Sequence, residues 1–277
     1  MSSSPSSPLS SGLEARAQAP RVVPAAGTPL ISFRGVSKSF DTREVLSNID
    51  LDVYEGETLV ILGRSGSGKT VLTSMLVGLN EPDTGTITVG GVDITHLKSE
   101  SDWRELRLKT GYLFQGSALF DSMTVGENVA FPMVHHLHLP AREVARRVHE
   151  KLEQVGLAAT EGMDPSELSG GMQRRAALAR SLALDPKIII YDEPTSGLDP
   201  ITGDEIGHLI RHLQETLKVT SIVVTHDLRL TRQVADRLTL LFGSSLVFLG
   251  TFEEFLRSTH PEVQRFLLQE TQEEAPP

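Results

Sequence analysis

The segment Gly63–Thr70 combines residue types and a spacing that suit the binding of phosphate groups. It reads GRSGSGKT, matches the pattern G-x-x-x-x-G-K-[ST], and follows the apolar run Leu59–Leu62. The glycines allow a tight turn, so that successive backbone N–H groups can face one anion at the start of a helix. Lys69 adds a positive charge for the terminal phosphates, and the Thr70 hydroxyl is a ligand that Mg²⁺ accepts. The residues expected to bind the nucleotide here are Gly63, Arg64, Ser65, Gly66, Ser67, Gly68, Lys69, Thr70 and Val71.

Two other interpretations of this segment fit less well. A glycine-rich turn without a ligand does not require the apolar strand before it or the apolar helix start, Val71-Leu72, after it. A dinucleotide site of the Rossmann type requires G-x-G-x-x-G, which is absent.

An acidic pair follows a second buried strand. The run Ile188–Tyr191 leads directly into Asp192 and Glu193. Asp192 is in the position to hold Mg²⁺, directly or through water, and Glu193 is one residue further, where a carboxylate can polarise an attacking water. A solvated turn is the alternative, and the continuous apolar strand argues against it.

A second glycine-rich segment, Leu168–Gln173, reads LSGGMQ and begins a long helical pattern. The Ser169 hydroxyl and the Gly170 and Gly171 amides form a second anion site at a helix N-terminus. With the phosphate loop, the acidic strand, the run SGLD at 196–199 and His226, all in the same order, the chain resembles the ATP-binding cassette (ABC) family over about residues 30–250. In that family two subunits sandwich two ATP molecules head to tail. The resemblance therefore implies contacts to the partner's ATP from Ser169, Gly170, Gly171, Gln173 and Asp199.

The resemblance assigns roles to further residues. Phe40 is similar to the aromatic residue that stacks on adenine, with Val45 beside it; a core phenylalanine is the competing interpretation. Gln115 is similar to the glutamine that touches Mg²⁺ and the attacking water, and His226 to the histidine that contacts the γ-phosphate. The resemblance thus implies an active ATPase. Its catalytic residues are Glu193, His226 and Gln115, and its Mg²⁺ ligands are Thr70, Gln115 and Asp192.

The pattern of apolar residues predicts the elements that hold these sites. Ile31–Val36 and Ile49–Val53 alternate as half-exposed antiparallel strands do. Leu59–Leu62, Ile188–Tyr191 and Ile222–Val224 are continuous apolar runs, typical of parallel strands buried on both faces. Ligands of such sheets bind at the carboxyl ends of the strands, where the motifs lie.

These patterns predict an α/β fold of the P-loop NTPase class, with the ABC ATPase arrangement of an antiparallel β subdomain and a helical insertion. Residues 1–28 form a Ser/Pro/Ala-rich tail without apolar period, expected to be disordered, and 29–255 form the ATP-binding domain. The helical insertion covers about 117–184, and 256–277 form a C-terminal helix with an acidic tail that frays from about Gln269.

Composition excludes several classes. The 277 residues include 26 Lys plus Arg and 36 Asp plus Glu, so the net charge of −10 argues against a nucleic-acid partner. The absence of Cys excludes disulfides and thiolate sites. No apolar run approaches the roughly 18 residues of a membrane span, so a soluble or peripheral protein is expected. The histidines at 135, 136 and 138 have no evident acidic partner, and those at 208 and 212 do not form H-E-x-x-H, so a metal site is not expected at either group.

The segment Phe114–Pro132 points to the work that ATP drives. Its sequence GSALF at 116–120 resembles ATPases of the Mla and Mce lipid systems. That resemblance implies a second copy of the chain, a membrane permease that meets this segment, and an MCE-domain lipid-binding protein. It implies the cytoplasmic face of the cell membrane, or alternatively a plastid inner envelope, to which a transit peptide in the Ser-rich tail would lead. An amino-acid or methionine importer is the alternative function. DNA-repair and translation ATPases fit least, because long coiled coils and a second cassette are absent.

Overall fold

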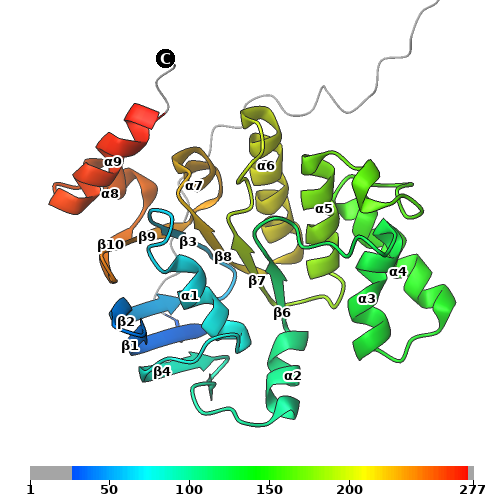
Figure 1. Ribbon diagram of the computed structural model, residues 1–277, viewed down its shortest axis with the longest axis horizontal. Coiled ribbons are helices and arrows are strands. Elements are labelled where there is room, and N and C mark those ends of the chain that lie inside the picture. The colour runs from blue at the N-terminus through cyan, green and yellow to red at the C-terminus, as the bar shows by residue number, and fades with distance from the viewer. Residues whose placement is uncertain (1–26, 274–277) are drawn as a thin grey trace, which may run out of the picture.

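The computed structural model of the chain describes residues 27–273, so most of the tail expected over 1–28 lies outside the described residues. Two sheets form the centre of the molecule (Figure 1). The smaller sheet has the order β2-β1-β4-β5, and the larger has the order β10-β9-β3-β8-β7-β6. The strands are β1 (Ile31–Phe40), β2 (Arg43–Val53), β3 (Thr58–Leu62), β4 (Thr84–Val89), β5 (Val92–Asp93), β6 (Thr110–Leu113), β7 (Ile188–Asp192), β8 (Thr220–Thr225), β9 (Arg237–Phe242) and β10 (Ser245–Gly250).

Helices surround the larger sheet, and a group of helices lies beside it at the right of the view (Figure 1). The helices are α1 (Lys69–Ser74), α2 (Glu100–Leu108), α3 (Val125–His136), α4 (Ala141–Gln154), α5 (Gly170–Ser181), α6 (Pro200–Leu217), α7 (Leu228–Val234), α8 (Phe252–Arg257) and α9 (Pro261–Glu273), with short 3-10 turns at Met75–Val77 and Pro165–Glu167.

The smaller sheet is antiparallel, as the alternating pattern predicts. β1 pairs with β2 on one edge and with β4 on the other. Its apolar side chains, among them Phe33 and Ile87, are buried with Leu72 of α1 in one cluster. This cluster joins the smaller sheet to the helix that follows the phosphate loop.

The larger sheet brings the motif loops together. Its five strands β9, β3, β8, β7 and β6 pair in parallel, and β10 pairs antiparallel with β9. Leu62 at the end of β3 is level with Thr225 of β8, and Asp192 at the end of β7 is level with Val224. The loops after these three neighbouring strands therefore leave the sheet at the same edge, which is where parallel sheets bind ligands.

The expected helical insertion contains α3, α4 and α5, which lie to the right of the sheet in Figure 1. Thr124 and Glu127 form a capping box at the start of α3. Apolar residues of α4, including Val148 and Leu152, are buried against the core that also contains α5. The fold class predicted from the sequence is confirmed in both its antiparallel sheet and its parallel sheet.

The C-terminal helices pack onto the domain. α8 crosses residue 255, the expected domain end, and Phe255 and Phe266 are fully buried in the core of the larger sheet. α9 extends through residues 269–273, into the segment that was expected to fray, and its earlier turns are anchored by the buried Val263 and Phe266. Within the described part of the chain, no helix has the length and apolar character needed to cross a bilayer.

Candidate functional site

The phosphate loop connects β3 to α1 and is shaped by close packing. Gly68, the residue before α1, has φ 104°, a conformation that favours glycine. A Cβ there would lie 2.7 Å from Val45 Cγ1 and 3.0 Å from the Val45 carbonyl oxygen. Val45 therefore packs against the loop itself. Ser67 Oγ is buried and has no hydrogen-bond partner within residues 27–273, so a donor-acceptor group faces the loop interior.

Lys69 is folded back over its own loop. Its ammonium group donates hydrogen bonds to the carbonyl oxygens of Gly63 (2.7 Å) and Arg64 (3.1 Å) and lies 3.3 Å from Glu193 Oε1. Only 5% of the residue is exposed. A charged amine held by two neutral carbonyls and one carboxylate is available to exchange these partners for phosphate oxygens.

An open cavity of about 640 Å³ lies beside the loop. Its lining includes the predicted residues Val45, Arg64, Ser65, Gly66, Ser67 and His226. Phe40 is not among the described residues that line it. Phe40 is 44% exposed, so the competing interpretation of a core phenylalanine is wrong, and Lys38 Nζ lies 5.4 Å from its ring centroid.

The acidic pair provides oxygen ligands next to the loop. Thr70 Oγ1 donates to Asp192 Oδ1 at 3.0 Å. Burial and, to a smaller extent, the charge of Glu193 raise the pKa of Asp192 against the effect of the Thr70 hydrogen bond. Hydroxyl and carboxylate oxygens are the hard ligands that Mg²⁺ takes. Thr70 and Asp192 thus fit the hard, oxygen-bound cation that was expected.

Glu193 has the geometry of a general base. It is buried, adopts φ 47°, and its Oε2 lies 3.0 Å from His226 Nδ1. Burial raises the pKa of Glu193, but the hydrogen bond from His226 and the charge of Lys69 outweigh it, so the pKa is lowered overall. The same hydrogen bond raises the pKa of His226. A left-handed backbone at a non-glycine residue is strained and is typical of functional sites.

The LSGGMQ segment forms the start of α5, away from α1 in the same chain (Figure 1). Ser169 Oγ accepts from the Met172 N–H at 3.3 Å, and Ser169 and Gly170 are exposed. A Cβ on Gly171 would lie 2.4 Å from Thr202 Cγ2, so α5 and α6 approach closely there. The exposed end of α5 is free to meet a ligand that comes from outside the chain.

Two residues expected to contact the partner's ATP have contacts within their own chain. Gln173 Nε2 donates to the carbonyl oxygens of Pro165 (3.0 Å) and Leu168 (3.3 Å), so it holds the backbone before Ser169 in place. Asp199 caps α6, accepting from the Thr202 N–H (3.1 Å) and the Thr202 hydroxyl (2.6 Å). The Thr202 hydrogen bonds lower the pKa of the exposed Asp199.

Gln115 follows β6 and is exposed. The residue before it, Phe114, stacks on Tyr112 with ring centroids 4.3 Å apart, and the Tyr112 hydroxyl lies 3.1 Å from Thr73 Oγ1 of α1. This chain of contacts connects the start of the helical insertion to the helix of the phosphate loop.

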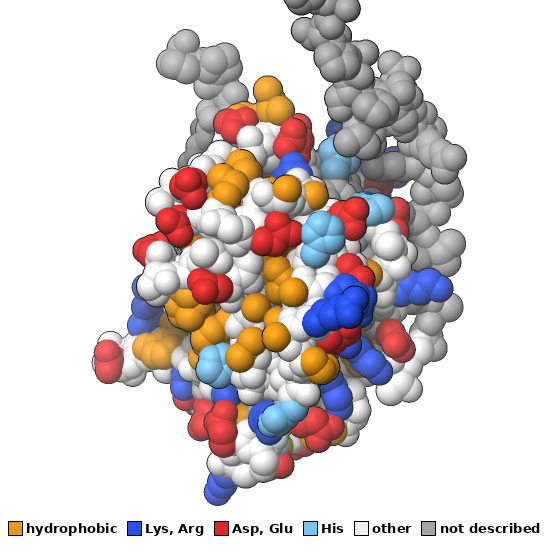
Figure 2. Space-filling model, turned by 90° about the vertical axis from the view of Figure 1, so that its right-hand side faces the viewer, with side chains coloured by type: hydrophobic (Ala, Val, Ile, Leu, Met, Phe, Trp, Pro, Cys, Tyr) orange, Lys and Arg blue, Asp and Glu red, His pale blue; other side chains and the backbone are white. Residues whose placement is uncertain are grey.

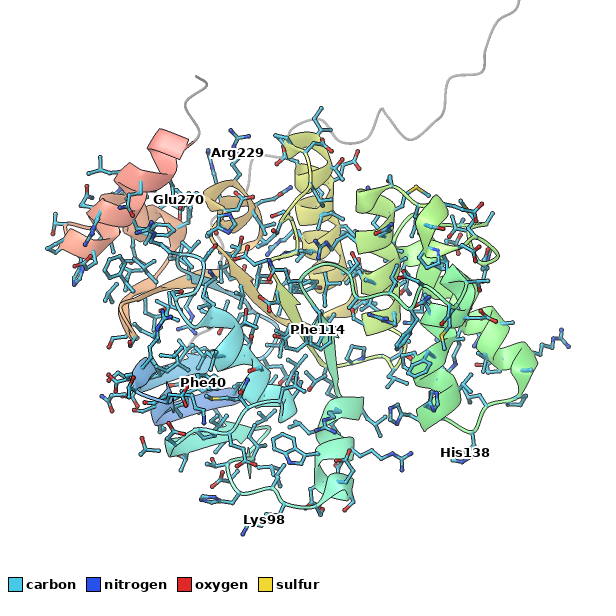
Figure 3. All side chains as sticks on the ribbon, in the orientation of Figure 1. Phe40, Lys98, Phe114, His138, Arg229 and Glu270 are labelled. Carbon is cyan, nitrogen blue, oxygen red and sulfur yellow. The ribbon has the colours of Figure 1, made fainter. Side chains whose placement is uncertain are left out.

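Sequence reasoning missed Glu270, which lines the cavity beside the phosphate loop and also the neighbouring one near Asp199. It lies on α9, and Arg229 on α7 lines the second cavity with it (Figure 3). No spacing in the sequence points to Glu270, because about 200 residues separate it from the loop and only the packing of α9 brings it there.

The comparisons with known proteins agree with this geometry. The family model described as "ABC transporter" matches residues 46–196. The chain is 41% identical over 237 residues to the "Probable ribonucleotide transport ATP-binding protein mkl" of Mycobacterium leprae, covering 86% of this chain and 68% of that protein. It spans about two thirds of the length of the mycobacterial relatives that it matches.

Another relative is matched over nearly its whole length. The "Intermembrane phospholipid transport system ATP-binding protein MlaF" of Haemophilus influenzae is 42% identical over 238 residues, 86% of this chain and 90% of that protein. Among solved structures, the ATP-binding cassette MJ0796, a dimer in a post-hydrolysis state bound to ADP and Pi, superposes with a TM-score of 0.74 at 30% identity, covering 80% of this chain and 98% of that one. The chain belongs to the ABC transporter family.

Proposed function

We propose that this chain is the ATP-hydrolysing subunit of a membrane transporter that moves phospholipids or other lipids between membranes. The observation that carries the ATPase part is the meeting of Lys69, Glu193 and His226, with contacts of 3.3 and 3.0 Å, beside a phosphate loop and an open cavity. The lipid part is supported by the 42% identity to the phospholipid transport protein MlaF, of which the chain spans 90%.

The residues of the site divide the work of hydrolysis. The loop amides and Lys69 bind the phosphates, and Glu193, ionised and buried, accepts a proton from the attacking water. His226 hydrogen-bonds to Glu193 and is placed at the rim of the same cavity, where it can meet the γ-phosphate. Thr70 and Asp192 would hold Mg²⁺, with Gln115 as a further ligand. When bound, Mg²⁺ neutralises charge on the phosphates.

A second copy of the chain completes the site. Ser169 and Gly170 are exposed at the start of α5, apart from the phosphate loop of their own chain. A symmetric pair would place each α5 N-terminus, with its exposed N–H groups, against the γ-phosphate held by the other chain. The dimeric cassette MJ0796, 30% identical, supports this arrangement.

A groove of about 480 Å³ between β6, α3 and α5 is the proposed docking site for a helical segment of the permease. Phe114, Phe120 and Phe131 line it, and Phe114 and Phe120 are 39% and 42% exposed. Phe114, which lines the groove, is the residue next to Gln115. A nucleotide-dependent shift of Gln115 therefore moves the groove and the permease segment bound in it. Further hydrophobic side chains are exposed on the side of the molecule that the helical part forms (Figure 2).

The names of the relatives point to different cargoes, phospholipids for MlaF and ribonucleotides for mkl. We favour lipids because the chain spans 90% of MlaF but 68% of mkl, and because the segment GSALF at 116–120 resembles the lipid ATPases. An MCE-domain protein then receives or supplies the lipid, and the chain acts at the cytoplasmic face of the inner membrane.

The experiment is purification of the tagged full chain with its native membrane partners in mild detergent, followed by mass spectrometry of proteins and lipids. We expect a permease, an MCE-domain protein and bound phospholipid, and ATPase activity that changes when the complex is placed in phospholipid vesicles. The Glu193→Gln complex is the matched control for hydrolysis. A soluble binding protein with an amino-acid-type permease, or bound ribonucleotide without lipid, would overturn the lipid assignment and leave the ATPase assignment intact.

A further inference from the structure

Arg174, on the first turns of α5, is a buried cation without an acidic partner. It is 4% exposed, and no ion pair with a carboxylate is found for it in the described part of the chain. Burial lowers its pKa. Its Nε is also buried without a hydrogen-bond partner among the described residues. Burying a guanidinium without a carboxylate partner is unfavourable, so packing alone does not account for arginine at this position.

The guanidinium connects two loops of the active site. Nη1 donates to the carbonyl oxygen of Phe114 at 3.3 Å, and Nη2 donates to that of Ser196 at 3.1 Å. Phe114 precedes Gln115. Ser196 begins the turn that ends at Asp199, and its own N–H bonds to the carbonyl of Glu193 at 3.2 Å. A planar fork with several N–H donors can hold two carbonyls at once in a fixed relation.

The neighbouring arginines of α5 have different contacts. Arg180 donates to the carbonyls of Ser117 (3.1 Å) and Ala118 (2.8 Å) and so holds the segment after Gln115, but not the turn at Ser196. Arg175 donates to Glu205 (2.6 Å) and to the Val155 carbonyl (3.4 Å), away from both loops. Among the described contacts of these three side chains, those of Arg174 alone join the two loops.

We propose that Arg174 is a positioning residue that makes the loop carrying Gln115 and the loop carrying Asp199 move with α5 as one unit. Ser169 lies at the start of α5. Gln115, which serves the ATP of this chain, and Ser169 and Asp199, which meet the ATP of the partner, therefore reach their nucleotides in one movement. The inference rests on the ATPase activity and not on the identity of the cargo.

The test compares Arg174→Lys and Arg174→Met with the adjacent control Arg175→Lys in the full chain. We expect kcat for ATP hydrolysis to fall about tenfold or more in both Arg174 variants, since a hydrogen bond to a charged group is lost. KM for ATP should stay within about twofold, because the Lys69 contacts to the phosphate loop are unchanged. Arg175→Lys should keep both kcat and KM near wild type.

Hydrogen–deuterium exchange of the nucleotide-free proteins gives a readout that does not depend on hydrolysis. Exchange at residues 114–118 and 196–199 should speed up together in Arg174→Lys and stay unchanged in Arg175→Lys. The proposal is overturned if kcat is retained in Arg174→Lys, even at a lowered Tm, or if exchange rises in only one of the two loops. Because hydrogen–deuterium exchange is measured without ATP, it tests the link that Arg174 makes between the two loops separately from the ATPase assignment.

Discussion

His226 Nδ1 and Glu193 Oε2 lie 3.0 Å apart, and this contact joins the ends of β8 and β7. The strand register brings the two residues close together: Asp192 is opposite Val224, Glu193 and His226 follow this pair by one and two residues, and the Glu193 N–H donates to the Val224 carbonyl at 2.9 Å. The histidine is 42% exposed at its side chain, whereas the carboxylate is 10% exposed. His226 can therefore exchange its proton with solvent, while its hydrogen bond favours the ionised form of the buried Glu193.

The first prediction concerns the titration of His226. Its pKa is raised by Glu193, so in the folded chain it holds its proton above the usual value of about 6.5. Since the folded pKa is raised, the stabilisation by this pair is complete below the unfolded pKa and is lost as pH rises through the folded one. Glu193→Gln should lower the His226 pKa, measured by NMR of the imidazole protons. An unchanged pKa in that variant would contradict the contact.

The second prediction is that Glu193→Gln binds ATP but is trapped as a closed dimer. Loss of a positioned base lowers the hydrolysis rate by about 10²–10⁴-fold. The amide also removes a negative charge 3.3 Å from Lys69, so ATP binding should persist. Size-exclusion chromatography with ATP should show a dimer for the variant, and the wild type under the same conditions is the control. Near-normal turnover would remove Glu193 from the role of base.

The third prediction is that Lys69→Ala weakens ATP binding. Lys69 supplies the one buried ammonium beside the phosphate loop in residues 27–273, and the loss of a charged hydrogen bond corresponds to about 10–100-fold in affinity. Isothermal titration calorimetry measures this directly. Lys109→Ala removes an exposed ammonium outside the loop, bound to Glu105 at 2.7 Å, and should leave the affinity near wild type. Equal affinities for Lys69→Ala and wild type would be incompatible with the phosphate-loop assignment.

The fourth prediction concerns the contact of α5 with α6. A Cβ at Gly171 would meet Thr202 Cγ2 at 2.4 Å, whereas a Cβ at Gly170 would meet Leu198 at 3.5 Å, an ordinary contact. Gly171→Ala should therefore destabilise the chain by about 1–3 kcal/mol through overpacking. Gly170→Ala should have a much smaller effect on thermal unfolding.

Thr202→Ser provides the matched rescue for that variant. It removes Cγ2 but keeps the hydroxyl that donates to Asp199 at 2.6 Å. The double variant Gly171→Ala/Thr202→Ser should recover most of the lost Tm. If it does not, the destabilisation does not come from this contact.

The phosphate loop, the acidic pair and the buried strands could be predicted from the sequence because each depends on local chemistry. Gly63–Thr70 binds phosphate through its own backbone amides, and Ile188–Tyr191 is apolar throughout because both of its faces are buried. The alternation in Ile49–Val53 likewise reflects one strand with one buried face, as found in β2. Such signals need no knowledge of which elements pack together.

Tertiary structure alone decided which side chains meet. Gln173 turns to the Pro165 and Leu168 carbonyls, Arg174 reaches carbonyls 60 and 22 residues away in sequence, and Glu270 reaches the cavity from α9. A side chain's direction and partners depend on strand order, register and helix packing, which arise from burial of the whole core and not from any one segment. A residue that acts through a distant backbone group therefore cannot be identified from the spacing of residues in the sequence.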